Sequence, residues 1–266
     1  MARVRLDDEL VRQGVCPDRD EALRLLMSGA VSAGGERLTS PGMLVRPGIE
    51  LHVKGQRPYV GRGGLKLSGA LDAFGVDPAG LSCVDVGCST GGFTDCLLQR
   101  GAARVLAVDV GRAQFAWQLR NDARVTLLER TNIVDVPALG YAGAFDLAVC
   151  DVSFTCVGRV LPAVLELLGP AGGFLTLVKP QFEVPRSQVD EGGVVRSAAA
   201  RAAALEGVIR QFARSGLEPA DACVSPILGA KGNTEFFLLG VRARLTWDAR
   251  ELDARVEELM QKAGAR

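Results

Sequence analysis

The first 53 residues carry a hydrophobic pattern that predicts a small domain of their own. Apolar positions recur at helical spacing over residues 5–13 and again up to Met27, in a second helix that Asp18 or Asp20 can cap. Three short strand-like pieces follow, separated by Gly-Gly and Pro-Gly turns. Two helices followed by a hairpin sheet form a complete module, so we predict an α+β domain over residues 1–53.

From residue 63 onward the pattern changes to apolar strands that alternate with helices. Strands are predicted at residues 82–87, 104–109, 124–129, 145–151, 173–179, 219–225 and 235–242, and helices at 64–74, 91–100, 112–120, 157–168, 197–215 and 246–266. Such a series is typical of a mostly parallel, Rossmann-like α/β sheet covered on both faces. Only a short loop separates the last two strands, so we expect an antiparallel pair at one edge. The polar segment 54–62 suits a linker, which leaves 63–266 as the second domain.

A glycine-rich turn follows the first strand of this second domain and opens a helix. Residues 85–93 read DVGCSTGGF, and such glycines let a ligand approach the backbone at the carboxyl ends of parallel strands. Ser89 stands where a dinucleotide-binding turn needs glycine, so the pyrophosphate fingerprint is absent. Asp109 ends the next strand and can bind ribose hydroxyls, a feature shared with NAD enzymes. Asn132 can meet an adenine edge or an amino-acid group, and either residue could instead be an ordinary helix cap.

Four charged residues stand at the ends of predicted elements. Asp151 and Lys179 end two buried strands, Lys66 precedes the sheet, and Glu235 opens the last strand. Each has a structural alternative: Lys66 as a solvated helix residue, for example, and Glu235 as an edge-strand charge that blocks aggregation. The topology nevertheless allows three of them to meet at one edge, so we interpret the set as a candidate catalytic group.

The strong preference for arginine makes the lysines informative. Only 5 of the 31 basic residues are lysine. A desolvated lysine can lose its proton near neutral pH and arginine cannot, so a lysine at the end of an apolar strand is a candidate general base. A neighbouring carboxylate can hold its ammonium group in place. Such a base could deprotonate a ribose hydroxyl as it attacks a sulfonium methyl group.

The charge balance allows a nucleic-acid partner without arguing for one. The chain has 31 basic and 31 acidic residues, a formal net charge of zero. Residues 1–62 contain 10 basic and 8 acidic residues, and the remainder contains 21 and 23. A net of +2 against −2 is a weak asymmetry.

Cysteine and histidine usage excludes several classes of protein. The seven cysteines are dispersed without a CxxC pair, which predicts buried thiols in a reducing compartment rather than disulfides or a metal site. His52 is the only histidine, so a histidine-based catalytic triad is excluded. The N-terminus lacks the apolar core of a signal peptide and no run is long enough to span a membrane, so we expect a cytoplasmic protein.

Residues 181–196 lack any periodicity. The segment QFEVPRSQVDEGGVVR contains Pro, Gly-Gly and mixed charge. Long irregular loops after a sheet strand are commonly active-site covers, so we interpret this one as a substrate-facing lid, with a mobile surface loop as the alternative.

Six motifs in combination resemble one known family. RGGLKL, DVGCSTGGF, ERTNI, DVSF, VKPQFE and GNTEFF are similar to motifs of the TlyA family, bacterial rRNA 2′-O-methyltransferases with an FtsJ/RrmJ-like catalytic domain. The N-terminal module resembles the RNA-binding domain of ribosomal protein S-four type. The resemblance covers about residues 3–242. It implies S-adenosylmethionine as cofactor, ribosomal RNA or a ribosomal subunit as partner, and methylation of a cytidine ribose, without a metal.

The resemblance also implies roles for individual residues. The catalytic tetrad of the family falls on Lys66, Asp151, Lys179 and Glu235. The methyl-donor site falls on the glycine-rich turn and the strand ends beyond it, at Asp85, Gly87, Ser89, Gly91, Gly92, Phe93, Asp109 and Asn132. In the N-terminal module the match is one of pattern, and Arg5, Arg19 and Arg24 are candidate RNA contacts.

Three other functions remain as alternatives. The same fold could methylate another RNA, a base or a small molecule. The chain could be a non-catalytic RNA-binding or assembly factor, although the intact tetrad argues against this. Members of the family have also been labelled haemolysins, but no amphipathic or membrane-spanning segment supports lysis here.

Overall fold

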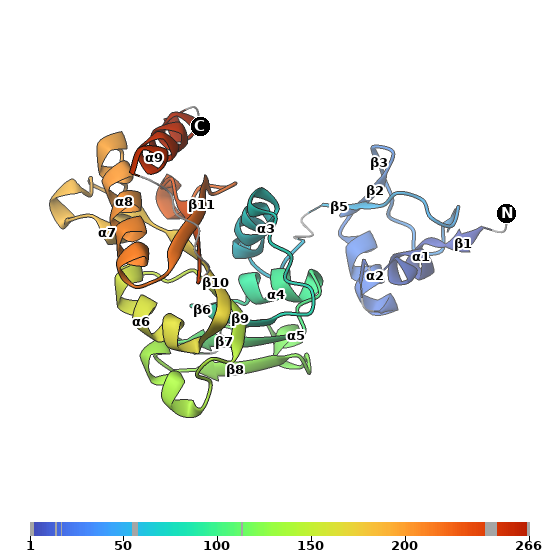
Figure 1. The fold of residues 1–266 in the computed structure, drawn as a ribbon. Coiled ribbons are helices and arrows are strands. Elements are labelled where there is room, and N and C mark those ends of the chain that lie inside the picture. The colour runs from blue at the N-terminus through green and yellow to red at the C-terminus, as the bar shows by residue number, and fades with distance from the viewer. Residues whose placement is uncertain are drawn as a thin grey trace. The chain divides into compact units, whose positions relative to one another are not determined.

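The computed structural model divides into two compact units, residues 1–57 and 58–266 (Figure 1). It describes residues 3–13, 15–16, 18–54, 58–112, 114–242 and 249–264. The border between the units falls inside the predicted linker 54–62, of which residues 55–57 lie outside the described part of the chain. The predicted terminal helix 246–266 is described as α9, Ala249–Gly264.

The first unit combines two helices with two small antiparallel sheets. Its elements are β1 (Val4–Arg5), α1 (Leu6–Arg12), α2 (Arg19–Met27), β2 (Val31–Ala33), β3 (Glu36–Arg37), β4 (Leu44–Val45) and β5 (His52–Val53). Strand β1 pairs with β4, and β2 lies between β3 and β5. Asp18, rather than Asp20, caps α2 by accepting a hydrogen bond from the backbone N–H of Glu21. The core consists of apolar side chains shielded from solvent, among them Leu6, Leu10, Ala22, Leu26 and Val31.

A buried carboxylate ties α1 to the rest of this unit. The Glu9 side chain is fully shielded from solvent and accepts hydrogen bonds from the side chains of Arg12 and Gln13 and from the backbone N–H of Gly48. The hydrogen bond from Arg12 contributes most to lowering the pKa of Glu9 to about 2. Because Gly48 lies 39 residues further along the chain, this one side chain joins the first helix to the turn before β5.

The second unit is built on one seven-stranded sheet in the order β11-β12-β10-β9-β6-β7-β8. The strands are β6 (Ser82–Val86), β7 (Arg104–Asp109), β8 (Val125–Glu129), β9 (Phe145–Cys150), β10 (Leu168–Val178), β11 (Glu218–Val224) and β12 (Phe236–Val241). Strands β6 to β10 are parallel, and β12 runs antiparallel to both of its neighbours, β10 and β11. The predicted α/β class, with an antiparallel pair at one edge, is confirmed. The reversed strand β12 lies one position inside edge strand β11.

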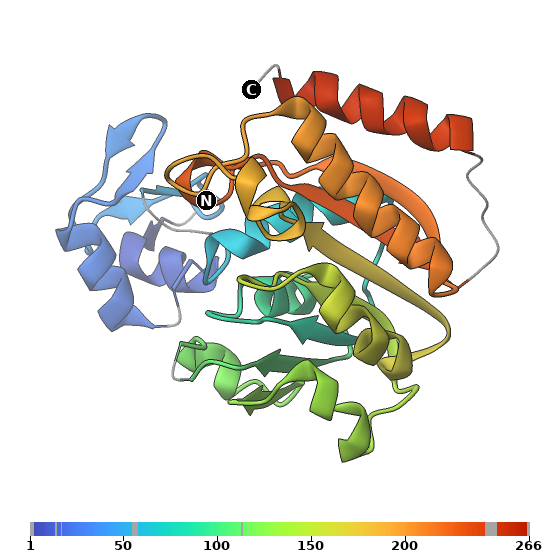
Figure 2. The same cartoon turned by 90° about the vertical axis from the view of Figure 1, so that its left-hand side faces the viewer.

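Helices cover both faces of this sheet (Figure 2). They are α3 (Arg62–Phe74), α4 (Gly92–Gln99), α5 (Trp117–Arg120), α6 (Val157–Leu167), α7 (Pro180–Glu183), α8 (Ala198–Arg214) and α9, with short 3₁₀ turns at Ile133–Asp135, Pro137–Leu139, Arg186–Gln188 and Ala230–Gly232. The apolar sides of α6, α8 and α9 form one core with the sheet, and those of α3, α4 and α5 form another. Within the described ranges, no helix has the length and apolar character needed to cross a membrane.

One predicted helix is much shorter than expected. We predicted helix over 112–120, whereas α5 spans only Trp117–Arg120. The preceding chain is held by tertiary contacts instead: the backbone N–H of Ala116 donates to the carbonyl oxygen of Thr90, and the Phe115 ring is buried in the core. These contacts with the glycine-rich turn override the helical pattern of the segment.

Replacing Glu9 by Gln is expected to destabilise the first unit by about 1–3 kcal/mol, because the buried position loses its charge-assisted hydrogen bonds with Arg12, Gln13 and Gly48. The stabilisation by Glu9 is present above its unfolded pKa and is lost as the pH falls toward about 2, because the folded-state pKa is the lower one. Hydrogen exchange of the α1 amides measures the effect. The exposed Glu36, changed to Gln, is the control, and equal protection in the two variants would contradict the prediction.

Candidate active site

The turn after β6 lies unusually close to neighbouring backbone. Gly87 and Gly91 have left-handed φ angles of 81° and 93°. A Cβ atom on Gly87 would lie 2.9 Å from the carbonyl oxygen of Asp151, and one on Gly92 would lie 2.9 Å from the backbone nitrogen of Gly64. Side chains cannot fit at these distances, so glycine allows the turn to pack against the end of β9 and the start of α3.

Asp85 lies beneath this turn with no exposed surface. Its Oδ2 accepts hydrogen bonds from the backbone N–H and the hydroxyl group of Thr94, at 2.9 and 2.6 Å. Its Oδ1 has no hydrogen-bond partner in the described part of the chain. Burial raises the pKa of Asp85 to about 7; the Thr94 hydrogen bonds oppose this shift, and the nearby carboxylates of Asp151 and Asp109 add to it. The side chain is therefore a buried acid poised near neutral pH.

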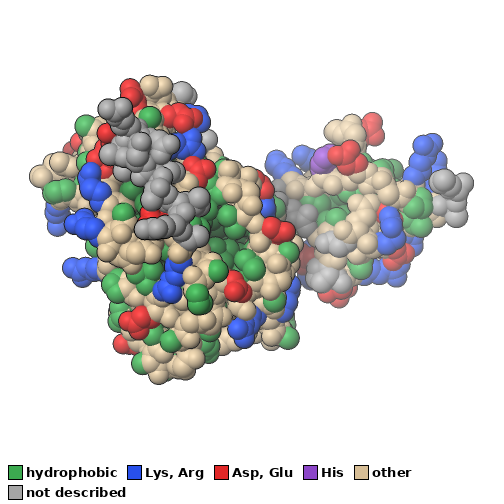
Figure 3. Space-filling model, viewed as in Figure 1, with side chains coloured by type: hydrophobic (Ala, Val, Ile, Leu, Met, Phe, Trp, Pro, Cys, Tyr) green, Lys and Arg blue, Asp and Glu red, His purple; other side chains and the backbone are tan. Residues whose placement is uncertain are grey.

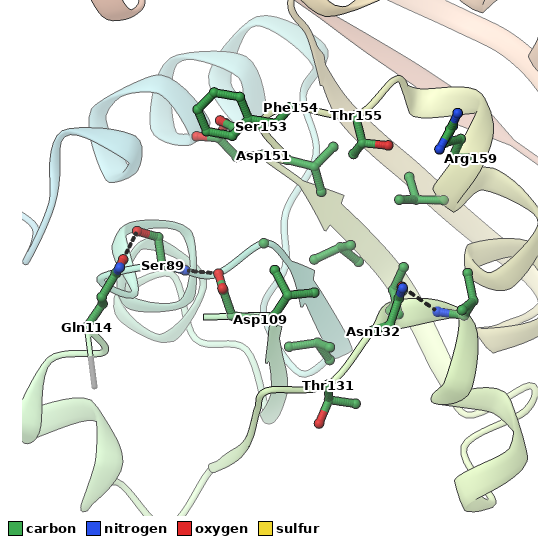
Figure 4. A pocket seen from close by; sticks show the side chains of 18 residues that line it. Ser89, Asp109, Gln114, Thr131, Asn132, Asp151, Ser153, Phe154, Thr155 and Arg159 are labelled. Atoms are coloured by element: carbon green, nitrogen blue, oxygen red, sulfur yellow. Dashed lines mark hydrogen bonds between the residues drawn. The ribbon is translucent and has the colours of Figure 1, made fainter. Parts of the chain in front are cut away.

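A cavity of about 820 Å³ opens at the carboxyl ends of β6, β7, β8 and β9 (Figure 4). Asp109 lies at its floor, where its two oxygens accept hydrogen bonds from the backbone N–H groups of Ser89 and Gly111, at 2.7 and 2.6 Å. Asn132 lies on the wall formed after β8 and accepts from the backbone N–H of Val134 at 3.3 Å. Asp151, Ser153 and Phe154 line the opposite side, after β9 (Figure 4).

The four candidate catalytic residues form two ion pairs. Lys179 Nζ lies 2.5 Å from Asp151 Oδ1 and donates a hydrogen bond to Ser153 Oγ at 2.8 Å. Lys66 Nζ lies 2.5 Å from Glu235 Oε2, across 169 residues of chain. Both lysines and Glu235 are buried. A charge buried in this way requires its partner, so each pair fixes the position of both side chains.

A smaller hollow of about 190 Å³ lies beside the Lys179–Asp151 pair and shares lining residues with the cavity. Gly63, Phe93 and Lys179 line it, together with Asp151 and Ser153, which also line the larger cavity. A Cβ atom on Gly63 would lie 3.9 Å from Asp151 Oδ2, so the first turn of α3 lies beside the Asp151 carboxylate. Lys66 stands one turn further along the same helix.

Most of the predicted cofactor residues line one of the two hollows beside the glycine-rich turn, and the others pack behind the turn. Gly87, Ser89, Asp109 and Asn132 line the large cavity, and Gly92 and Phe93 line the smaller hollow. Asp85 lies below the turn, and Gly91 packs against the side chains of Phe115 and Leu119.

Aromatic and carboxylate contacts that the sequence did not reveal fix the wall after β9. The Phe154 side chain is 92% exposed at a left-handed φ of 63°, and its ring lies 5.4 Å from that of Phe182. Glu183 accepts a hydrogen bond from the backbone N–H of Val157, the first residue of α6, and burial raises the pKa of Glu183. Segment 181–183 of the predicted lid therefore holds this wall. One signal for these contacts is present in the sequence: Phe154 lies close to Asp151, and residues 181–183 lie close to Lys179, along the chain.

The arginines that we proposed as RNA contacts have partners within the first unit. Arg5 lies 2.7 Å from Asp7, Arg19 lies 2.7 Å from Asp8, and Arg24 pairs with Glu21. Part of each of these arginine side chains remains exposed, so the pairs leave surface for other contacts. The described residues contain no group of three or more His, Cys, Asp or Glu side chains that could hold a metal ion.

Asp85 is expected to make stability fall as the pH rises. The folded-state pKa of about 7 exceeds the unfolded value, so the contribution is present at low pH and is lost as the pH approaches 7. Between pH 5 and 8, the Tm of the wild type should fall by about 5 °C relative to that of Asp85→Asn. Calorimetry without cofactor measures the difference. The exposed Asp135, changed to Asn, is the control, and parallel wild-type and Asp85→Asn curves would refute the assignment.

Comparison with known proteins agrees with this geometry. Residues 59–242 match the family model of FtsJ-like methyltransferases, and residues 4–51 match the S4 domain. The chain is 43% identical to the 16S/23S rRNA (cytidine-2′-O)-methyltransferase TlyA of Mycobacterium tuberculosis, over 89% of both chains. It is also 43% identical to the putative rRNA methyltransferase YqxC of Bacillus subtilis, over 88% of this chain and 84% of that one.

A solved structure resembles the whole chain. The putative hemolysin from Streptococcus thermophilus has a TM-score of 0.73 and 36% identity, and the match covers 100% of this chain and 97% of that one. The resemblance read from the six motifs is therefore confirmed. An FtsJ-like domain over most of the chain, an S4 domain before it and full-length relatives place this protein in the TlyA family of FtsJ-like methyltransferases.

Proposed function

We propose that this protein transfers the methyl group of S-adenosylmethionine to a ribose 2′-hydroxyl of ribosomal RNA, in the cytoplasm where ribosomes are found. One observation carries the proposal: the buried Lys179 forms an ion pair with Asp151, and Asp151 lines the cavity beside the glycine-rich turn. The FtsJ-like domain and the cytidine-2′-O activity named for the M. tuberculosis relative support the same reaction and make cytidine the expected nucleotide.

The residues of the cavity fit the cofactor. Gly87 of the glycine-rich turn lines the cavity and has no side chain to keep a ligand from the backbone, and the cavity volume of about 820 Å³ exceeds what the cofactor alone needs. The Asp109 carboxylate stands at the end of β7, where a ribose is bound in related sheets. Asn132 stands on the opposite wall and is suited to the adenine or amino-acid end. Asp85 lies beneath the turn, where its hydrogen bonds with Thr94 fix the start of α4 below the cofactor site. When bound, the cofactor supplies an electrophilic methyl group.

Lys179 and Asp151 are the groups that we assign to the reacting hydroxyl. Lys179 Nζ pairs with Asp151 and donates a hydrogen bond to Ser153. These two partners leave one further hydrogen-bonding position on the nitrogen, and we assign it to the substrate hydroxyl group. A hydroxyl group bound there would be oriented for attack on the sulfonium methyl group. The Lys179–Asp151 pair would take the hydroxyl proton as the O–CH3 bond forms and the CH3–S bond breaks, with a neutral thioether as the leaving group.

We assign Lys66 and Glu235 a positioning role for the Lys179–Asp151 pair. Neither lines the large cavity, and their ion pair links α3 to the start of β12. We assign them to holding the first turn of α3 against Asp151 and to shaping the positive potential around the site.

RNA fits the site better than a small molecule does. The wall after β9 carries an almost fully exposed phenylalanine, Phe154, at the mouth of the cavity, where an apolar side chain can face a large partner. On the face that Figure 3 shows, basic and acidic side chains are interspersed without one continuous basic surface. We therefore expect RNA affinity to come from individual side chains around the cavity and from the S4 domain, rather than from the net charge of the protein.

Lys179→Ala is expected to lower kcat at least about 100-fold while the Kd for the cofactor changes less than about threefold, because the loss is in proton transfer and positioning. The assay is transfer of methyl label from S-adenosylmethionine to separate unmodified small and large ribosomal subunits. Lys179→Arg keeps the charge but not the ability to release a proton, so it should also be inactive.

Lys262→Ala is the matched control, because Lys262 is exposed and pairs with Glu258 far from the cavity. Full activity of Lys179→Ala would remove the assigned role. No label on either subunit or on the assembled ribosome, with the cofactor shown to bind, would remove rRNA as the substrate.

A further inference from the structure

A second hollow opens on the same edge of the sheet, outside the cofactor cavity. Its volume is about 540 Å³, and it is lined by Arg112, Phe115, Trp117, Arg120, Glu129 and Arg130. None of these residues lines the cofactor cavity. The two sites are nonetheless adjacent. Arg112 and Arg130 follow the carboxyl ends of β7 and β8, and Asp109 at the end of β7 lines the cavity.

The backbone around Trp117 is fixed by hydrogen bonds, but the indole side chain does not pack into the core. Its indole is 78% exposed, whereas Phe115 and Leu119 on either side are 5% exposed and pack against Gly91. The segment is fixed by the hydrogen bond from Ala116 to Thr90 and by one from the Asn121 side chain to the Trp117 carbonyl oxygen, at 2.7 Å. A single exposed apolar residue is common on protein surfaces, so the indole alone indicates nothing.

The charges beside the indole make the hollow unusual. Arg120 is neutralised by Glu129 at 2.5 Å. Arg112 and Arg130 are exposed, and no carboxylate in the described part of the chain lies within ion-pair distance of either. Arg130 also holds a left-handed φ of 54°, fixed by a hydrogen bond from its backbone N–H to the Gly111 carbonyl oxygen. Two unpaired guanidinium groups thus line the same hollow as an exposed aromatic side chain.

We propose that this hollow binds an unpaired nucleotide of the RNA substrate next to the methylated one, with its base stacked on Trp117 and its phosphate held by Arg112 and Arg130. This rests on the proposed function. An aromatic face with adjacent cations fits a base and its phosphate together, whereas a protein partner would need carboxylates or a larger apolar surface. A strand whose target ribose enters the cavity reaches this hollow, because Thr131 borders the cavity and Arg130 precedes it.

Fluorescence gives a direct test. The chain has two tryptophans, so in the full-length Trp247→Phe variant the emission comes from Trp117. A protein-free, single-stranded RNA oligonucleotide of mixed sequence should quench this emission and protect it from acrylamide, and added salt should reverse both effects. Filter retention measures binding separately. Binding without a change in emission, or no binding of the oligonucleotide, would overturn the proposal.

Kinetics with ribosomal subunits separate this role from catalysis. Trp117→Ala and Arg112→Gln should each raise the KM for the subunit about tenfold, with kcat and cofactor Kd within about twofold, and Trp117→Phe should recover most of the loss. The exposed Leu139→Ala and Arg214→Gln are matched controls and should behave as wild type.

The outcomes distinguish the two proposals. An unchanged KM with methylation intact would refute the nucleotide site and leave the methyltransferase assignment standing. A raised KM without quenching by protein-free RNA would indicate a ribosomal protein as the partner and would also refute it. Loss of methylation by the wild type itself would instead remove the proposed function.

Discussion

The close approach of backbone to backbone at the turn after β6 is the constraint on which the site depends. Glycine at positions 87 and 92 lets this turn lie against the end of β9 and the first turn of α3. A side chain at either position would separate these segments by several tenths of an ångström or more. The cofactor floor, Asp151 and the helix that carries Lys66 are therefore parts of one packed unit, in which small displacements are felt throughout.

The reversed direction of β12 explains how Glu235 joins this unit. Parallel strands present their carboxyl ends at one edge of a sheet, and Asp151 and Lys179 stand there because they follow β9 and β10. Strand β12 is antiparallel to β10, so its first residues lie at that same edge. Glu235, which immediately precedes β12, can therefore meet Lys66 without any long connecting loop.

The same turn also connects the reaction site to the proposed RNA contact. Ala116 donates to Thr90 within the turn, and Phe115 and Leu119 pack against Gly91, so α5 is fixed directly on the cofactor site. Trp117 then has a defined position relative to the cavity. Because the arrangement is already rigid, RNA binding at the catalytic domain costs less conformational entropy.

The sequence by itself determined the alternation of strands and helices, the antiparallel pair and the glycine-rich turn, because hydrophobic period and glycine placement are local properties of the chain. It also identified Lys66, Asp151, Lys179 and Glu235 as candidates, from their positions at element ends. Only the tertiary structure decided which of them pair. Lys66 and Glu235 are 169 residues apart, and no local pattern records a contact across that distance. The short α5, the exposed Phe154 and the unpaired arginines beside Trp117 were likewise decided by packing, because burial and ion pairing depend on neighbours that only the folded chain provides.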